Sequence, residues 1–236
     1  MSAALTIAKR EIRTYFNSPV AYIVVTVFML IAGFLFFQNV LLERQAEMRG
    51  FFGLTPLLFV FFTPAMTMRL IAEEKGSGTI EMLVTMPVPD WQIVLGKFIG
   101  AMGLLAAMVG MTFFYAITLM LMGPADRGPI IAGYIGLLLM GGAYVAIGVM
   151  ASSFTRNQIV AFIIALFISF CLFLFGNIAQ FAPAWLQPIL AFLSMGTHFD
   201  AISRGVIDSR DVLYYVSVMA ISLVVATVSL ESRKWN

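Results

Sequence analysis

Charged side chains are scarce in this sequence: Asp, Glu, Lys and Arg together make up 11% of its 236 residues, against about 25% in an ordinary soluble domain. Hydrophobic residues make up 61%. So low a charge content argues against a soluble globular domain. Apolar runs of about 20 residues, which are long enough to cross a hydrocarbon core as helices, favour an integral membrane protein instead.

Cysteine and histidine are also nearly absent. A single cysteine, Cys171, can form neither a disulfide nor a thiolate metal centre within one chain, and its place in an apolar run is typical of a small buried residue. The only histidine, His198, lies in a polar stretch, and a metal site needs several ligands. The sequence therefore predicts no metal site, no cofactor site and no catalytic residue on this chain.

Six apolar runs are long enough to span a membrane. They cover 20–42, 53–71, 98–122, 130–152, 158–178 and 212–230. The sequence therefore predicts an all-α polytopic membrane protein whose single domain covers 1–236. Several glycines in 133–148 are expected to allow close packing of the fourth span against its neighbours.

Two absences narrow the function of such a protein. The phosphate-binding motif G-x-x-x-x-G-K-[ST] does not occur, so the chain does not bind and split ATP by that device. No ionisable residue lies in the middle of any expected span, although carriers coupled to protons or sodium usually place such groups at membrane depth. A secondary carrier or channel is therefore only a weak alternative.

The N-terminal stretch MSAALTIAKREIRTYFNSP is too charged for a cleavable signal peptide, whose apolar core directly follows its positive end. The pattern over 2–17 instead predicts an amphipathic helix that lies in the headgroup layer. One side of this helix carries Leu5, Ala8, Ile12, Tyr15 and Phe16, and another carries Lys9, Arg10 and Arg13.

Basic residues indicate the orientation. If the N-terminus is cytoplasmic, six spans return the C-terminus to the same side, and nine of the fourteen Lys and Arg residues then lie inside. The positive-inside rule favours this arrangement, with both termini cytoplasmic and residues such as Arg127 outside. The segment 179–210 would then lie outside as short re-entrant helices, held by burial of Phe181, Trp185 and Phe192 against the spans. Asp208 or Asp211 is expected to start the last span.

A polar island, RLIAEEKGSGTIEMLVTMPVPDWQIVLGK, separates the second and third spans. We expect Glu73, Glu74 and Lys75 to lie in water, Gly76 and Gly78 to allow a turn, and residues 79–86 to form a short helix that Pro87 ends. Asp90 is expected to cap the next helix, and Lys97 to mark the edge of the third span. The short helix could dock in a groove on another protein or rest on lipid, but its acidic residues disfavour an anionic membrane surface.

The island also carries a family resemblance. The stretch EEKGSGTIEMLVTMP resembles the E-E-x-x-x-G-T-x-E-x-L-x-x-x-P signature of permease subunits of ABC-2 type transporters. HFDAISRGVIDSRDVLYY and the terminal SLESRKW resemble a narrower branch of that family, associated with gliding motility and with nitrous-oxide-reductase maturation.

The resemblance implies a fold and a division of labour. Residues 2–17 would be a connecting helix, residues 79–86 a coupling helix gripped by a separate ATPase, and the turn at 153–157 a second, smaller contact. It implies coupling roles for Glu73, Glu74, Gly78, Thr79, Ile80, Glu81, Leu83 and Pro87. ATP and Mg²⁺ would bind on the ATPase, so the permease itself would not be an enzyme.

The partners also follow from the resemblance. Two ATPases and a second permease, identical or homologous, would complete an exporter in the bacterial inner membrane. Membrane lipid and a periplasmic or auxiliary membrane subunit are further expected partners, and nucleic acid is not. A scaffold for a motility or maturation complex, without export of cargo, remains an alternative.

The family exports between its two permeases, along spans 1, 2 and 5. The residues that could line such a path are Phe37, Asn39, Thr63, Thr67, Ser169 and Phe173. The many phenylalanines of these spans suit a lipid-like or amphipathic cargo, although phenylalanine facing lipid explains the same composition. The hydroxyl groups could equally satisfy helix backbones.

Overall fold

The computed structural model describes residues 3–43, 48–79, 88–122 and 126–232, with the backbone alone for 39–43. The described part of the chain is helical and has no strand. Its helices are α1 (Ala3–Asn17), α2 (Pro19–Glu43), α3 (Arg49–Thr67), α4 (Ala72–Ser77), α6 (Asp90–Met111), α7 (Phe113–Met122), α8 (Arg127–Phe154), α9 (Gln158–Ala179), α10 (Gln187–Leu193), α11 (Met195–Ser203) and α12 (Ser209–Glu231).

Six helical segments are long and apolar enough to cross a membrane, which confirms the expected fold class. Two of them are interrupted. The second candidate span joins α3 to α4 through a turn at 68–71, and the third joins α6 to α7 at Thr112. The Thr112 hydroxyl donates to the carbonyl of Val109 at 2.6 Å, and the Tyr134 hydroxyl of α8 donates to the Thr112 carbonyl at 2.8 Å.

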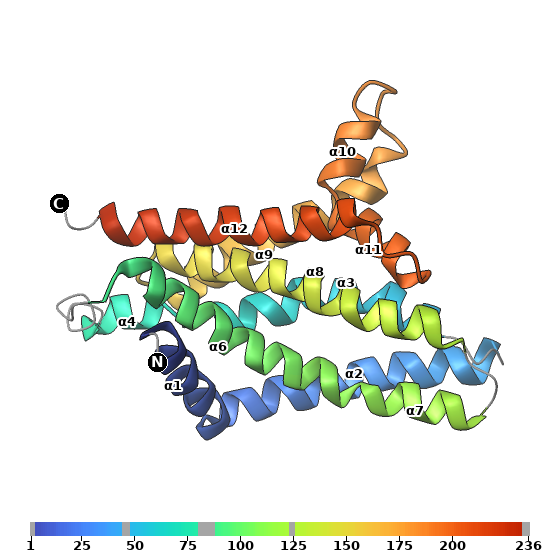
Figure 1. Cartoon of the computed structure of the whole chain (residues 1–236), viewed down its shortest axis with the longest axis horizontal. Coiled ribbons are helices and arrows are strands. Elements are labelled where there is room, and N and C mark those ends of the chain that lie inside the picture. The colour runs from blue at the N-terminus through green and yellow to red at the C-terminus, as the bar shows by residue number, and fades with distance from the viewer. Residues whose placement is uncertain (1–2, 44–47, 80–87, 123–125, 233–236) are drawn as a thin grey trace.

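The spans pack around α8, which is the most buried of them (Figure 1). Its glycines allow neighbouring helices to approach closely. A Cβ atom at Gly141 would lie 2.7 Å from Leu105 of α6, and one at Gly136 would lie 2.8 Å from Ile202 of α11. The expected packing role of these glycines is therefore confirmed.

Both chain ends lie at one end of the bundle, together with α1 and α4 (Figure 1); we call this the junction end, and the other the far end. Helix α1 packs obliquely on α6, where Gly96, Gly100 and Gly103 leave room for it. A Cβ atom at Gly100 would lie 2.5 Å from that of Glu11. The side of α1 buried in the protein comprises Ala4, Ala8, Glu11 and Tyr15.

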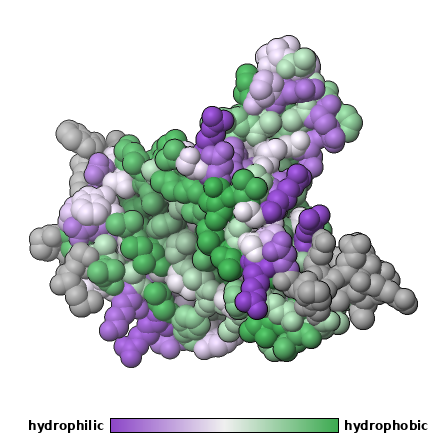
Figure 2. All heavy atoms as spheres, turned by 45° about the vertical axis from the view of Figure 1, so that its right-hand side comes forward, coloured by the Kyte–Doolittle hydropathy of each residue, from purple (hydrophilic) through white to green (hydrophobic). Residues whose placement is uncertain are grey.

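The outer surface of the bundle is apolar. Helices α9 and α12 bury few of their residues, and Figure 2 shows hydrophobic side chains across the middle of one face. Cys171 on α9 is only partly buried, because α9 presents most of its surface outward, so the expectation that it is a buried residue is wrong. On α1, Leu5 and Phe16 are likewise exposed.

The segment 179–210 contains two parts that differ in how far they are buried. Helix α10 projects sideways from the bundle at the far end (Figure 1), and none of its residues is buried. Phe181 and Trp185 are 83% and 71% exposed, so the expected burial of this part is wrong. Helix α11 packs against α8 with Phe199 and Ile202 buried, because these positions lie on one helical face.

The last span begins as expected. Asp208 is the N-cap of α12, and its carboxylate accepts a hydrogen bond from the Arg210 amide at 3.0 Å.

Candidate functional site

The site lies at the junction end, where the polar island meets α1 and α6. It begins at the break between α3 and α4, which Ser152 of α8 stabilises. The Ser152 hydroxyl accepts from the amides of Ile71 and Ala72 at 3.0 and 2.9 Å and donates to the Met68 carbonyl at 3.0 Å. The first amides of a helix have no partner within the helix, so this one side chain makes the break possible.

Helix α4 ends at Gly78, which has φ of 73°. This left-handed conformation is costly for other residues, and it provides the turn expected at this position. Gly76 lies inside α4 instead, against the turn that follows α8: a Cβ atom there would lie 2.9 Å from the Arg156 carbonyl oxygen.

Lys75 does not lie in water, as the sequence suggested, but is buried. Its ammonium donates to the Ser153 carbonyl at the end of α8. The Ser229 hydroxyl of α12 donates to the same carbonyl at 3.0 Å. Helix α4 is thereby bonded to α8, and α8 to α12.

An ion-pair cluster joins α1, α4 and α6. Lys97 of α6 is 1% exposed, and its Nζ lies 3.0 Å from Glu11 Oε1 and 2.8 Å from Glu74 Oε1. Arg10 Nη2 lies 3.4 Å from the same Glu74 oxygen. Because an unpaired buried ammonium costs several kcal/mol, Lys97 requires these carboxylates. We call Glu11, Glu74 and Lys97 the charge cluster.

The charge cluster differs from the sequence expectation in two ways. Lys97 is not at an exposed membrane edge but is enclosed between α1 and α4, because the small residues of α6 let α1 approach it. Glu11 was not singled out at all. The available signal was an acidic residue one turn before Tyr15, in a stretch whose other charges are basic.

Tyr15 and Arg69 attach α1 to the end of α3. The Tyr15 hydroxyl donates to the Met66 carbonyl at 2.8 Å, and the Arg69 guanidinium lies 5.3 Å from the centre of the Tyr15 ring. Burial raises the pKa of the Tyr15 phenol well above its usual range, so the hydroxyl remains a donor at physiological pH.

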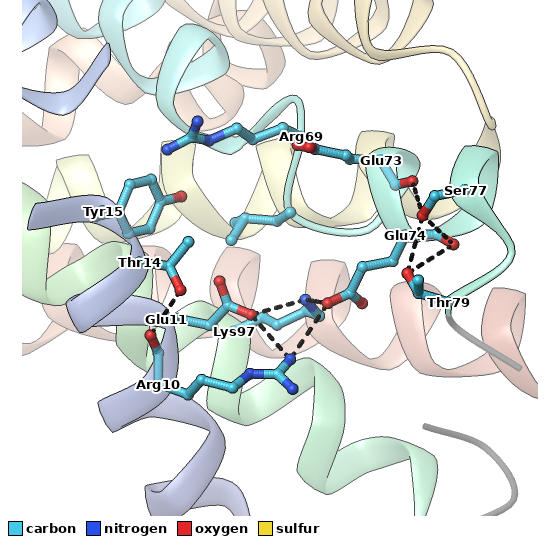
Figure 3. A pocket seen from close by; sticks show the side chains of 11 residues that line it. Arg10, Glu11, Thr14, Tyr15, Arg69, Glu73, Glu74, Ser77, Thr79 and Lys97 are labelled. Carbon is cyan, nitrogen blue, oxygen red and sulfur yellow. Dashed lines mark hydrogen bonds and ion pairs between the residues drawn. The ribbon is translucent and has the colours of Figure 1, made fainter. Parts of the chain in front are cut away.

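These elements surround a pocket of about 550 Å³ (Figure 3). In this view the side chains of Arg10, Glu11, Glu74 and Lys97 converge from three helices. The pocket is lined by Arg10, Glu11, Thr14, Tyr15, Arg69, Leu70, Glu73, Glu74, Ser77, Thr79 and Lys97. Three cations and three carboxylates balance one another there, which suits a mechanical link between helices better than a site for a charged ligand.

The residues singled out for coupling fall into two groups. Glu73, Glu74, Gly78 and Thr79 lie at or beside this pocket, whereas Ile80, Glu81, Leu83 and Pro87 fall outside the described residues. Asp90 is buried and is the first residue of α6; Pro89 occupies the N-cap position expected for it. Pro89 has the extended backbone of an N-cap residue, and the helical conformation begins one residue later, at Asp90.

The residues singled out for a transport path do not form one site within the chain. Thr63 and Thr67 are buried and donate to carbonyls one turn back in their own helix, at 2.6 and 2.8 Å. Ser169 is buried on α9, Phe37 packs against Phe36 and Tyr115, and Phe173 lines a second pocket at the far end. The side chain of Asn39 lies outside the described part.

Comparison with known proteins identifies a family. A model described as "ABC-2 family transporter protein" matches residues 44–229. The chain is also similar to the probable multidrug ABC transporter permease YbhR of Escherichia coli K12 and to that of strain O157:H7. Each is 28% identical over 139 residues, or 58% of this chain and 37% of the relative. The chain thus matches well under half the length of these curated relatives.

Proposed function

Because the chain belongs to the ABC-2 transporter family, we propose that it is the permease subunit of an ATP-driven exporter. Permeases of this family are membrane subunits that generally work with an ABC ATPase and are not themselves catalytic. In the proposal, ATP and Mg²⁺ bind on that separate chain, which docks on the segment 79–86. The observation that carries this assignment is the family match over residues 44–229. The charge cluster supports the coupling route, because it joins the helix before that segment to two others.

The contacts of α4 support a route by which movement of the ATPase could reach the membrane spans. The docking segment follows α4 directly, and α4 bonds to α8 through Lys75 and to α1 and α6 through Glu74. Ser152 secures the α3 end of the same helix. A movement imposed on the segment would therefore displace several spans together. The ATPase can drive such a change only if it binds one arrangement of the helices better than the other.

The proposed orientation places the junction end in the cytoplasm of a bacterium, with both termini inside. The distribution of basic residues supports it. A cysteine introduced at Arg127, with Cys171 removed, should react with a membrane-impermeant thiol reagent in intact cells, and one at the exposed Ser77 of α4 should not. Labelling at Ser77 alone would reverse the orientation.

The proposed working unit contains two permeases, identical or homologous, and two ATPases, surrounded by membrane lipid. The apolar outer surface of α9 supports a cargo path between two permeases, because few of its residues are buried within one chain. An amphipathic cargo is compatible with this surface. The YbhR relatives are described as probable multidrug permeases, which fits such a cargo.

A membrane scaffold for a motility or maturation complex is the second candidate. The resemblance of 198–215 to that branch favours it, and so does the exposed, projecting α10, which could contact an auxiliary subunit. ATP-dependent movement of an amphipathic compound across vesicles that contain the complex would favour the exporter. ATP hydrolysis without any such movement would favour the scaffold.

The docking proposal is tested by Leu83→Asp. The change would bury an unpaired carboxylate in the contact with the ATPase, at a cost of several kcal/mol. The permease should reach the membrane at its normal level but lose the ATPase on affinity purification. The control is Val206→Asp, which adds the same charge to an exposed position at the far end and should retain the ATPase. Retention of the ATPase by Leu83→Asp would refute docking at this segment.

A further inference from the structure

A second pocket, of about 270 Å³, lies at the far end between α3, α9 and α11. Its lining is largely polar and comes from Gly53, Pro56, Phe173, Gly176, Asn177, Ser194, Gly196, Thr197 and Asp200. Asp200 is the one charged residue among these. A pocket that enclosed a whole drug-sized ligand would measure roughly 300–1,000 Å³, so this one fits a headgroup rather than a complete molecule.

The Asp200 carboxylate has no hydrogen bond or ion pair among the residues that the structure describes. Arg204, one turn further along α11, is close enough to lower the pKa of Asp200 but forms no ion pair with it. Partial burial acts more strongly in the opposite direction and raises the pKa of this carboxyl above its usual value. Asp200 is nevertheless exposed, so a ligand can reach its carboxylate, which has no counterion among the described residues.

The other polar groups of the pocket differ in their availability. The Ser194 hydroxyl accepts from the Thr197 amide at 3.5 Å, and the Thr197 hydroxyl donates to the carbonyls of Ala191 and Ser194, so both hydroxyls bond to α10, α11 or the cap between them. The Asn177 amide has no such partner in the described part of the chain and is exposed. Asn177 and Asp200 therefore remain to receive a ligand.

The surroundings favour an organic cation over a metal ion. A single carboxylate provides few of the ligands that a metal requires, whereas the ring of Phe173 can attract an ammonium group through its π face. Phe170 and Ile163 lie three and ten residues before Phe173, on the same side of α9, and both are exposed. An apolar tail could follow this side of the helix toward the middle of the bundle.

We propose that this pocket binds the ammonium headgroup of a single-chain cationic amphiphile, with Asp200 as its counterion and the α9 surface along its tail. Asn177 accepts a hydrogen bond where the headgroup carries an N–H. The inference rests on the proposed export function and defines its cargo class. It would make this pocket a binding site near one end of the cargo path, distinct from the charge cluster at the junction end.

The test is binding of radiolabelled dodecyltrimethylammonium to the full-length permease in phosphatidylcholine nanodiscs, corrected for empty nanodiscs. Saturable binding should weaken at least tenfold in Asp200→Asn and stay within threefold of the natural protein in Asp200→Glu. The matched control is Asp208→Asn, which removes a charge from the same end of the bundle while asparagine keeps the α12 cap. Binding of dodecyl sulfate should not respond to any of these changes.

Equal affinity of the natural protein and Asp200→Asn for the cation would overturn the proposal. So would displacement of the probe by millimolar sodium or magnesium, because it would assign the pocket to an inorganic cation. The same preparations are assayed for co-purification of the ATPase. If Asp200→Asn does not change the affinity for the cation while the ATPase co-purifies, only this binding site is refuted. If the ATPase is absent from every preparation, the proposed exporter function is refuted.

Discussion

The junction end and the projection, by which we mean residues 180–193 with α10, differ in an unusual way: a charged side chain is buried in the first, and apolar side chains are exposed in the second. Lys97, a cation, is almost completely buried, whereas Trp185 is mostly exposed. The difference lies in the partners. Each ion of the charge cluster meets an opposite charge from another helix, while α10 leaves the bundle and buries none of its residues, although its Phe192 ring contacts Tyr214 of α12. Whether a side chain is buried in these two regions therefore depends on whether another helix packs against it, and not on its polarity.

The two short helices at the far end differ in the same way, since α11 is packed against the bundle and α10 is exposed. Helix α11 is attached to α12: the Tyr214 and Tyr215 hydroxyls donate to the carbonyls of Leu193 and Met195 at 2.6 and 2.7 Å. His198 lies 2.7 Å from Asp211 and stacks on Tyr214, so it belongs to this attachment and not to a polar loop. Helix α10 lies beside α9, and its Phe192 carbonyl is 3.0 Å from His198 Nε2, yet none of its residues is buried. The far end thus combines a fixed helix with an exposed one.

The largest expected effect comes from reversing a charge in the charge cluster. Glu74→Lys places a second ammonium beside Lys97 and should lower the free energy of unfolding by roughly 3–5 kcal/mol. Thermal unfolding of the purified protein in detergent measures it. Glu231→Lys, on an exposed position of α12 outside this pocket, should change it by less than about 0.5 kcal/mol. The double variant Glu74→Lys/Lys97→Glu should recover at least part of the loss. If both single variants behave alike, the charge cluster is not what stabilises the junction.

An intermediate effect is expected at the helix break. Ser152→Ala leaves two buried amides and one carbonyl without their partner, which should cost about 1–3 kcal/mol. The measurement is again thermal unfolding. Ser232→Ala removes an exposed hydroxyl whose hydrogen bond is local, and it should be nearly neutral. A neutral Ser152→Ala would mean that the α3–α4 break does not depend on α8.

The smallest effect is expected on the projection. Trp185→Ala removes a large apolar side chain, but one that is exposed, so the free energy of unfolding should change by less than about 0.5 kcal/mol. Phe199→Ala on α11 removes a buried ring and should cost roughly 3–5 kcal/mol. Equal losses in the two variants would show that the segment just before α10 is packed as firmly as α11, and the contrast between the two would be wrong.

Much of the fold was predictable because spans depend on local composition. Six apolar runs, the N-terminal helix and the start of α12 at Asp208 all follow from patterns within about 20 residues. The glycines of α8 were also interpretable, since close packing is the usual reason for glycine in a span. The burial of 180–193 was predicted wrongly, because apolar side chains become buried only where the chain path brings another surface against them.

The candidate site was predictable in location but not in its contacts. The polar island marked Glu74 and Lys97 as unusual, yet Glu11 lies 86 residues before Lys97, and no local pattern connects them. The same holds for Ser152, which caps a helix from about 80 residues away. For Lys75, the sequence indicated water, and the carbonyl of Ser153 was the actual partner.

The sequence by itself determined that this is a six-span helical membrane protein of the ABC-2 family, because hydrophobic length and a short motif are local properties of the chain. Only the tertiary structure decided which charges are buried and which of them form pairs, such as Lys97 with Glu11 and Glu74. That outcome depends on how helices α1, α4 and α6 approach one another. A buried ionisable group raises or lowers the free energy of unfolding according to its neighbours in space. Where those neighbours are distant in the sequence, they come together only when the helices pack.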